Sequence, residues 1–351
     1  MVCSAVRTRA VAAHAATRLP LRHSGGLTDS FARVPRTPPF SALGFVALSP
    51  TFGWRDLAAM DARAALPLLD VRVPEVYERF DDLSATAFLE SVRFPEAAHH
   101  LAFEVFSRSF FADPCELSAA ELLLMFHIYF LGSAEGLLFD VPTEPFPRHS
   151  GIRSATTSRA SAHSCAPVPG TRDHSRDGGG ADVRTEAGTD RHQAVVLALD
   201  TAGLRQTVAA SPGLGTSTWR DSIAALRTAP PFLVSRLWLD RPVRADRPGF
   251  LGTSGYGGLD NISSLERYEG EAARWAARTG GSVIELHAYA ADPAAERKDV
   301  QDGLVDRLHE VYPETREARI VDARHEWRAD CPFFERVPTA GAPPCALPTR
   351  G

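Results

Sequence analysis

Hydrophobic positions follow a helical rhythm in the first half of the chain. Between residues 74 and 110, apolar side chains recur every three or four positions, a spacing typical of helices that bury one face. Pro74 stands at the start of one such segment, where its missing N–H costs nothing, Ser84 can cap a second, and Pro95 opens a third. The pattern therefore predicts a run of short helices.

A further helix is predicted after Ser118. Ser118 and Glu121 form an S-x-x-E capping box, in which each side chain bonds a free backbone N–H of the other residue. The segment that follows is apolar on all sides except at His127. We therefore expect either a central core helix or a wall that faces something apolar.

After residue 193 the spacing of hydrophobic residues changes to one typical of strands. A continuous apolar run, "AVVLALD", predicts a strand covered on both faces, whereas "FLVSRLWLD" and "SVIELHAYA" alternate and predict half-buried strands. A helix is expected at 297–311, with one apolar stripe that ends before Pro313, and "ARIVDARHEW" predicts a last strand. This order favours an α+β fold with a mixed sheet.

Two stretches lack any such pattern. Residues 148–191 contain no Leu, Met or aromatic residue, and their only large aliphatic residues are Ile152, Val168 and Val183. Such a segment cannot bury enough surface to offset the entropy of ordering its backbone, so we expect it to be disordered. Residues 334–351 are dominated by Pro, Ala and Gly, and we expect a disordered tail there.

Residues 1–37 contain several arginines and one acidic residue, Asp29, which is typical of a transit peptide. However, Ser24, Gly25 and Gly26 interrupt any helical stripe. We therefore favour a disordered or out-of-frame segment. No run of the sequence reaches the ~18 apolar residues that a membrane-spanning helix needs.

Composition excludes some classes of function. With 351 residues, 44% of them apolar, the chain can form a globular core, and a net charge of −5 argues against a nucleic-acid partner held by overall charge. Five cysteines without a CxxC pair predict neither a zinc knuckle nor a disulfide framework, and they suit a reducing cytoplasm. Lys298 is the only lysine among many arginines, which indicates a GC-rich gene.

No short motif assigns a chemistry. The glycines of "GTSGYGG" at 252–258 have the wrong spacing for a dinucleotide fingerprint and predict a loop between strands. The histidines have no metal-ligand spacing, and Asp322, His325 and Glu326 are interpreted as surface polar residues because no nucleophile accompanies them. The sequence thus predicts no metal site and designates no catalytic side chain.

Aromatic residues gather in the helical half. Phe103, Phe106 and Phe110 lie along one helical face, and Phe126, Tyr129 and Phe130 follow in the next helix. These side chains can form a core, or they can line a tunnel for a long apolar ligand, since ligand cavities are lined mainly by such groups. The pattern alone leaves both alternatives open.

Three long strings carry a family resemblance: "PFSALGFVALSPTFGWRDLAAMD", "FEVFSRSFFADPCELSAAELLLMFHIYFLGSAEGLLFDVPTEPFP" and "AVVLALDTAGLRQ". The chain resembles the carotenoid-desaturase branch of the FAD-dependent amine-oxidase superfamily. Within that branch it looks most like the actinobacterial desaturase/methylases that aromatise the β-ionone ring of β-carotene. The likeness covers about residues 38–147 and 192–333.

The resemblance implies an α/β FAD domain joined to a substrate domain of helices and mixed sheet. On this comparison, 38–147 is the helical part of the substrate domain, 192–229 returns to the FAD domain with a strand and a helix, and 230–333 supplies the substrate-domain sheet and helix. The N-terminal Rossmann unit with its GxGxxG turn, expected before Pro38, is missing from the printed sequence, as is the glycine-aspartate segment expected after Pro332.

The resemblance also implies a function. It implies an FAD-dependent oxidoreductase of carotenoid biosynthesis that transfers hydride to the flavin, a lipophilic carotenoid substrate, and a cytoplasmic location with a peripheral contact to the inner face of the membrane. The tunnel then becomes the preferred interpretation of the six aromatic residues. Ala198 and Asp200 become candidate cofactor contacts, because flavin-domain ligands lie beyond the carboxyl ends of strands.

The missing flavin motifs suggest that the activity is impaired in this chain. Our hypothesis is that Arg148 marks a change of reading frame, which is regained near His192, and that other frames of the gene encode the missing motifs. A genuine insertion at 148–191 is the rival explanation. In a different functional class, the chain would be a non-catalytic remnant that binds apolar ligands or partners through exposed aromatic surface.

Overall fold

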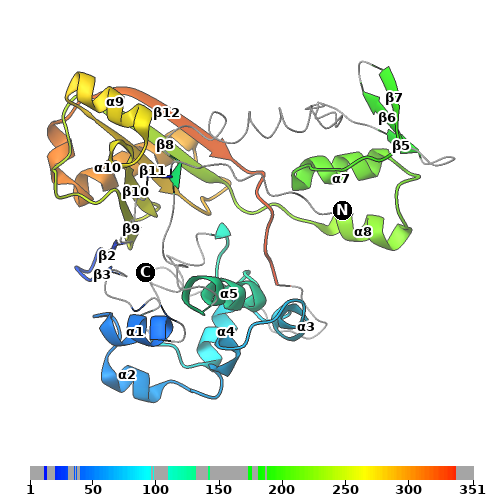
Figure 1. Cartoon of the computed structure of the whole chain (residues 1–351), viewed down its shortest axis with the longest axis horizontal. Coiled ribbons are helices and arrows are strands. Elements are labelled where there is room, and N and C mark those ends of the chain that lie inside the picture. Colours follow the sequence, from blue (N-terminus) through cyan, green and yellow to red (C-terminus); the bar gives the residue numbers. More distant parts are fainter. Residues whose placement is uncertain are drawn as a thin grey trace.

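The computed structural model describes four main stretches of the chain, residues 20–30, 40–95, 110–131 and 188–336. Short pieces between them are described at 12–13, 35, 37, 98, 141–142, 173–175 and 181–185. A sheet with two covering helices lies on one side of the structure, a group of short helices lies below it, and α7 (Thr201–Ala210) and α8 (Ser217–Ala225) lie to one side (Figure 1). The fold is therefore α+β, as predicted.

The central feature is a mixed sheet of seven strands in the order β12-β8-β11-β10-β9-β2-β3. All neighbours are antiparallel except β2 and β9, which run parallel. The strands predicted from alternation near residues 232 and 282 are confirmed, as is the last predicted strand near residue 318. The bounds are β2 Pro20–His23, β3 Thr28–Ser30, β8 Phe232–Leu239, β9 Phe250–Ser254, β10 Asn261–Ser264, β11 Ser282–Ala288 and β12 Ile320–Arg328.

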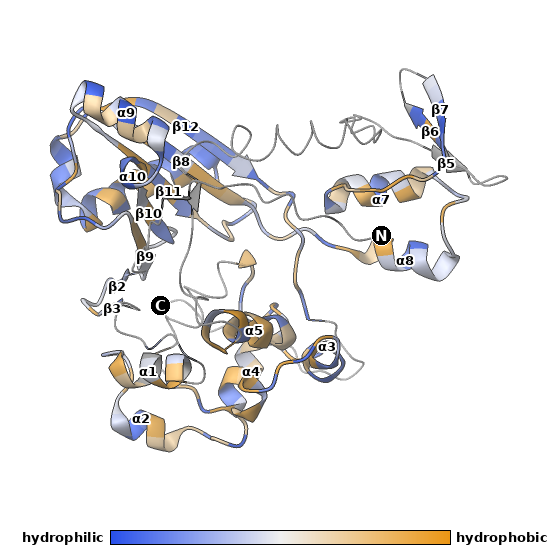
Figure 2. Cartoon of the chain, viewed as in Figure 1, coloured by the Kyte–Doolittle hydropathy of each residue, from blue (hydrophilic) through white to orange (hydrophobic). Residues whose placement is uncertain are grey.

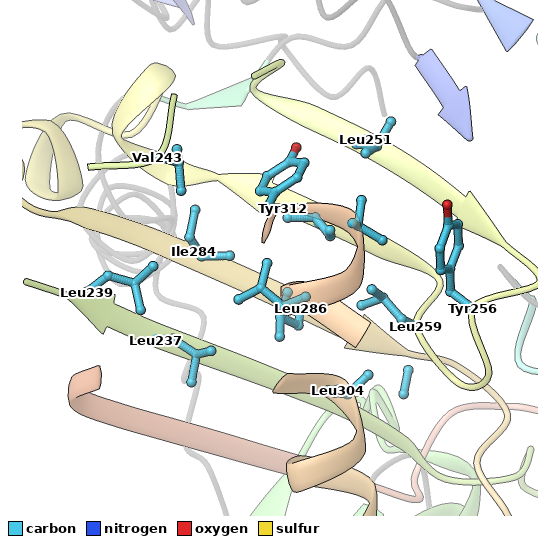
Figure 3. Close-up of a cluster of buried hydrophobic side chains, with 14 of the residues drawn as sticks. Leu237, Leu239, Val243, Leu251, Tyr256, Leu259, Ile284, Leu286, Leu304 and Tyr312 are labelled. Atoms are coloured by element: carbon cyan, nitrogen blue, oxygen red, sulfur yellow. The ribbon is translucent and has the colours of Figure 1, made fainter. Parts of the chain in front are cut away.

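Each face of the sheet has its own core because side chains alternate along a strand. Leu237 and Leu286 point to the face covered by α10 (Arg297–Val311), where they join the cluster in Figure 3. Leu304, Leu308 and Val311 of α10 are buried in the same cluster, so the predicted apolar stripe is confirmed. Trp238 and Val283 point to the opposite face, which carries α9 (Gly270–Thr279).

The helical region forms a second core. Phe88, Leu117 and Leu123 are almost completely buried at its centre. Ser84 caps its helix as predicted, accepting a hydrogen bond from the Ala87 N–H at 3.1 Å. The helices are α1 Phe40–Leu48, α2 Trp54–Ala59, α3 Glu75–Phe80, α4 Ala85–Ser91 and α5 Ala119–Phe126, followed by the π-helix η6 His127–Leu131.

Ser118 caps α5 as predicted, but the reciprocal capping box does not form. The Ser118 hydroxyl accepts from the Ala120 N–H at 3.1 Å rather than from that of Glu121. The Glu121 carboxylate instead accepts a hydrogen bond from the Tyr77 hydroxyl at 2.9 Å. Burial raises the pKa of Glu121, and burial together with this hydrogen bond raises the pKa of Tyr77 to about 12. A tertiary contact between α3 and α5 thus replaces a local one.

The expectation that residues 1–37 lack structure is wrong for residues 20–30. These residues form the β2–β3 hairpin, and β2 pairs with the edge of β9. Ser24, Gly25 and Gly26 make the turn, with Gly26 at a φ of +91° that favours glycine. They interrupt a helical pattern because they connect two strands.

The expectation for residues 148–191 is also wrong in part. Three strands, β5 (Asp173–Ser175), β6 (Ala181–Thr185) and β7 (Gly188–His192), pair into a small antiparallel sheet. Every residue of β7 is exposed. Backbone pairing and an ion pair between Arg191 of β7 and Asp182 of β6, 3.0 Å apart, therefore join β6 and β7.

The segment at residues 331–336 connects the sheet to the helical region. The Ala229 N–H donates to the Cys331 carbonyl at 2.9 Å, and the Ser118 N–H donates to that of Phe334 at 3.0 Å. The start of the predicted disordered tail is thus ordered. Cys331 is a free thiol, whereas Cys115 is disulfide-bonded, which the cysteine pattern did not predict. Within the described ranges, no helix is long and apolar enough to cross a membrane.

Candidate functional site

Polar side chains form a network on the sheet face that carries α9. Strand register aligns them, because Arg236 of β8 is paired with Glu285 of β11, and His287 of β11 is paired with Asn261 of β10. Tyr289 follows directly after β11. Five side chains from three strands therefore meet at one end of this face.

Arg236 and Glu285 form the charged part of the network. Nε and Nη2 of Arg236 donate to Oε2 of Glu285 at 2.8 and 2.7 Å, and Nη1 lies 3.6 Å from Oε2 of Glu269. The Glu285 side chain is 16% exposed. Burial alone would raise the pKa of Glu285, but the hydrogen bonds that Glu285 accepts from His287 and Arg236, together with the charge of Arg236, lower it. Glu285 is thus a carboxylate at neutral pH.

His287 connects this carboxylate to a phenol. Its Nε2 lies 2.9 Å from Oε1 of Glu285, and its Nδ1 lies 2.7 Å from the Tyr289 hydroxyl. Because a carboxylate can only accept, Nε2 of the neutral imidazole carries the proton and Nδ1 accepts one from Tyr289. The Tyr289 oxygen in turn accepts from Nδ2 of Asn261 at 3.1 Å. Hydrogen bonds therefore run in one direction along this network, from the Asn261 amide through Tyr289 and His287 to the Glu285 carboxylate.

An aromatic wall borders the network at Tyr289. Phe111 stacks on Phe232 with ring centroids 4.7 Å apart, and it meets the Tyr289 ring edge-on at 5.2 Å. Burial is the largest of the effects that raise the pKa of Tyr289 to about 12, and the nearby phenol of Tyr129 contributes to the rise. The helical region thus contributes Phe111 and Tyr129 to the end of the sheet.

One buried acceptor in this site has no partner. The Oδ1 atom of Asn261 is buried and makes no hydrogen bond. Such orphaned polar groups are rare in folded proteins and often occur at functional sites. Among the described residues, Asp29, His127, Ser264 and Tyr312 also carry such an atom, but only Asn261 hydrogen-bonds to the Tyr289 hydroxyl of this network.

The predicted tunnel residues are brought together only in part. Phe126 and Phe130 stack on each other with centroids 4.8 Å apart, and Phe130 is completely buried. Phe110 instead packs edge-on against Phe334 at 6.0 Å, within the helical core. Tyr129 lies near Tyr289, as described above. Phe103 and Phe106 lie outside the described residues, so their role stays a prediction.

Sequence reasoning missed the polar network, although a signal was present. In the strings "SRLW" and "IELHAY", the polar residues Arg236, Glu285, His287 and Tyr289 stand at alternate positions among buried aliphatic residues. Polar side chains at a spacing of two lie on one face of a strand. That face was expected to be solvated, whereas α9 and Phe111 cover it.

The candidate cofactor residues do not follow a strand. The predicted strand at 194–200 makes no ladder with any described strand, and Val196 is 89% exposed. Asp200 caps α7, because its Oδ1 accepts from the Gly203 N–H at 2.6 Å. Ala198 is exposed. The strand prediction is wrong for the described structure, and a cofactor contact at Ala198 or Asp200 stays a prediction.

The N-terminus of α7 does not fit the pyrophosphate of FAD. A pyrophosphate needs several outward-pointing N–H groups at a helix N-terminus. At α7 the Asp200 carboxylate already takes the Gly203 amide, and its negative charge would repel a phosphate. A Cβ at residue 203 would meet the same carboxylate oxygen at 3.1 Å, so the space beside this amide is filled by the protein itself.

Comparison with known proteins decides the family. The profile described as flavin containing amine oxidoreductase matches residues 31–340. The chain belongs to this family. FAD is therefore the cofactor that the family assigns, although α7 does not supply its pyrophosphate cradle. No group of three His, Cys, Asp or Glu side chains in the described part of the chain could hold a metal ion.

Two curated relatives share a name. The chain is 67% identical over 327 residues to the carotenoid phi-ring synthase of Streptomyces griseus, covering 91% of this chain and 62% of that protein. It is 39% identical over 134 residues to the carotenoid phi-ring synthase of Chlorobaculum tepidum, covering 37% of this chain and 20% of that protein. The chain thus spans less than two thirds of the length of either relative.

Solved structures agree on the fold. Cyclohexylamine oxidase from Brevibacterium oxydans aligns with a TM-score of 0.62 at 11% identity, covering 89% of this chain and 66% of that one. Putrescine oxidase bound to putrescine aligns with a TM-score of 0.58 at 12% identity, covering 91% and 70%. The confirmed mixed sheet and helices are therefore those of the amine-oxidase fold.

Proposed function

We propose that this chain acts in carotenoid biosynthesis as an FAD-dependent oxidoreductase that desaturates and aromatises the terminal ring of a carotenoid. The observation that carries this proposal is the 67% identity to a carotenoid phi-ring synthase along 91% of the chain. The aromatic wall of Phe111, Phe232 and Tyr289 supports it, because a hydrocarbon ring packs well against such side chains.

A peripheral membrane contact is part of the proposal. In and just after α1, the polar residues point inward: Ser41, Ser49 and Thr51 are buried. Apolar residues of α1 and α2 point outward, and Phe40, Leu43, Leu48 and Trp54 are between 54% and 82% exposed. Figure 2 shows apolar residues on these helices. A surface of this kind suits the boundary of a lipid layer, where aromatic side chains are favoured.

Purification of the full chain from cells that accumulate β-carotene tests the proposal. Bound flavin with conversion of β-carotene to an aromatic product is the expected result. A colourless protein that yields no product would refute the proposed activity. A protein that retains carotenoid but neither flavin nor turnover would favour the second candidate, a non-catalytic chain that binds apolar ligands.

A further inference from the structure

The Tyr289 hydroxyl lies where an apolar surface meets a charged network. On one side its ring contacts Phe111, and on the other its oxygen contacts His287 and, through it, Glu285. Nδ1 of His287 lies 2.7 Å from the Tyr289 oxygen, and Nε2 of His287 lies 2.9 Å from Oε1 of Glu285. A proton that reaches the phenol therefore has a continuous path away from the apolar surface.

Ring desaturation needs such a path. Each new double bond requires that one hydrogen leaves with two electrons as hydride, while a second leaves the neighbouring carbon as a proton. A flavin, the cofactor that the family assigns, would supply the oxidant for the hydride when bound. The proton has no acceptor in a hydrocarbon, so the protein must supply one.

We propose that Tyr289, His287 and Glu285 form the relay that accepts this proton, an inference that rests on the proposed function. The C–H bond breaks and its electron pair forms the new C=C bond. The proton bonds to the Tyr289 oxygen as the original phenolic proton moves to Nδ1 of His287. The resulting imidazolium is stabilised by the Glu285 carboxylate, 2.9 Å from its Nε2–H.

The surroundings favour this direction of transfer. Among the described residues, the titratable and charged groups around His287 include Glu285 and Tyr289 from its own strand and its end, Arg236 of β8, Asp260 before β10, Tyr268 and Glu269 before α9, and Tyr129 of η6. The raised pKa of Tyr289 keeps the phenol protonated at neutral pH, so it passes a proton on rather than acting as a free phenolate. The lowered pKa of Glu285 keeps the negative charge at the far end.

The first test needs no turnover. In the full chain labelled with ¹⁵N-histidine, His287 is identified by loss of its signals in His287→Gln. At mildly alkaline pH we expect its proton on Nε2 and the shift of a hydrogen-bonded acceptor at Nδ1. Tyr289→Phe should move Nδ1 to the shift of an unbonded acceptor while Nε2 keeps its proton. A proton on Nδ1, or no response to Tyr289→Phe, would overturn the relay.

The second test uses β-carotene conversion. Tyr289→Phe and His287→Gln should lower the rate by about a hundredfold or more while carotenoid binding persists. The control is His325→Gln, which should convert normally, because His325 lies on the edge strand β12 and its Nδ1 contacts the hydroxyl of Ser235 on β8. If the wild-type chain converts β-carotene and Tyr289→Phe does so at the same rate, the relay is refuted. If the wild-type chain shows no conversion, the proposed function is refuted, and the tautomer test alone decides the relay.

Discussion

Replacement of Arg236 by methionine tests the charged part of the network. The substitution removes two hydrogen bonds to Glu285 and leaves a carboxylate that is only 16% exposed without the guanidinium paired with it. Breaking a fully buried ion pair costs about 3–5 kcal/mol. Because the Arg236 side chain is 35% exposed and Glu285 keeps its bond from His287, we expect a loss of about 2–3 kcal/mol in the free energy of unfolding.

The loss should depend on pH in a defined direction. The folded pKa of Glu285 lies below its ordinary value of 4.5, so its contribution to stability is present above 4.5 and is lost as pH falls through the folded pKa. Arg236→Met raises the folded pKa. The deficit of the variant should therefore be complete at neutral pH and shrink as pH falls through the folded pKa of the variant and then that of the wild type, because below both values the carboxyl is neutral in both proteins.

Urea unfolding followed by tryptophan fluorescence measures both values, since Trp238 lies on the same face of the sheet. Arg324→Met is a matched control on the neighbouring strand, because the Arg324 side chain is 76% exposed and its contact to Asp322 is 4.0 Å long. We expect it to cost about 1 kcal/mol or less. The reasoning fails if the two variants lose the same stability, or if the Arg236→Met deficit is independent of pH.

Two further substitutions test other parts of the chain. Asp200→Ala should destabilise α7 by about 1 kcal/mol, as measured by hydrogen exchange, because it removes the N-cap. Asp200→Asn retains a capping side chain, so equal losses of stability in the two variants would contradict a capping role. Trp54→Gln should reduce co-sedimentation with phospholipid vesicles, because Trp54 is 82% exposed beside α1. Trp219→Gln on α8, where the side chain is 38% exposed, is the control, and equal binding by both variants would argue against the α1–α2 surface.

Elements with a strong internal pattern could be predicted from the sequence. β8 and α10 each carry their core-facing side chains at one fixed spacing, so Leu237 and Leu304 identify the buried face locally. The polar network could not be predicted in the same way. Arg236 and Glu285 are 49 residues apart and meet only because β8 and β11 pair in one register. Register depends on the whole sheet, which no local pattern contains.

Two short segments show that the presence of a neighbouring strand, rather than the local sequence pattern, decides whether a strand forms. "AVVLALD" has the composition of a buried strand, yet residues 194–200 pair with no described strand and Val196 stays 89% exposed. "PLRH" at β2 looks unsuited to a sheet, yet it pairs with β9, and Leu21 packs where a Cβ on Gly252 would lie only 2.4 Å from its Cδ2 atom. A glycine on β9 thus admits the side chain from β2. An extended segment gains its backbone hydrogen bonds only from a neighbouring strand. Strand formation therefore depends on a sheet edge with free N–H and C=O groups and on a neighbouring surface that accommodates the side chains of the segment.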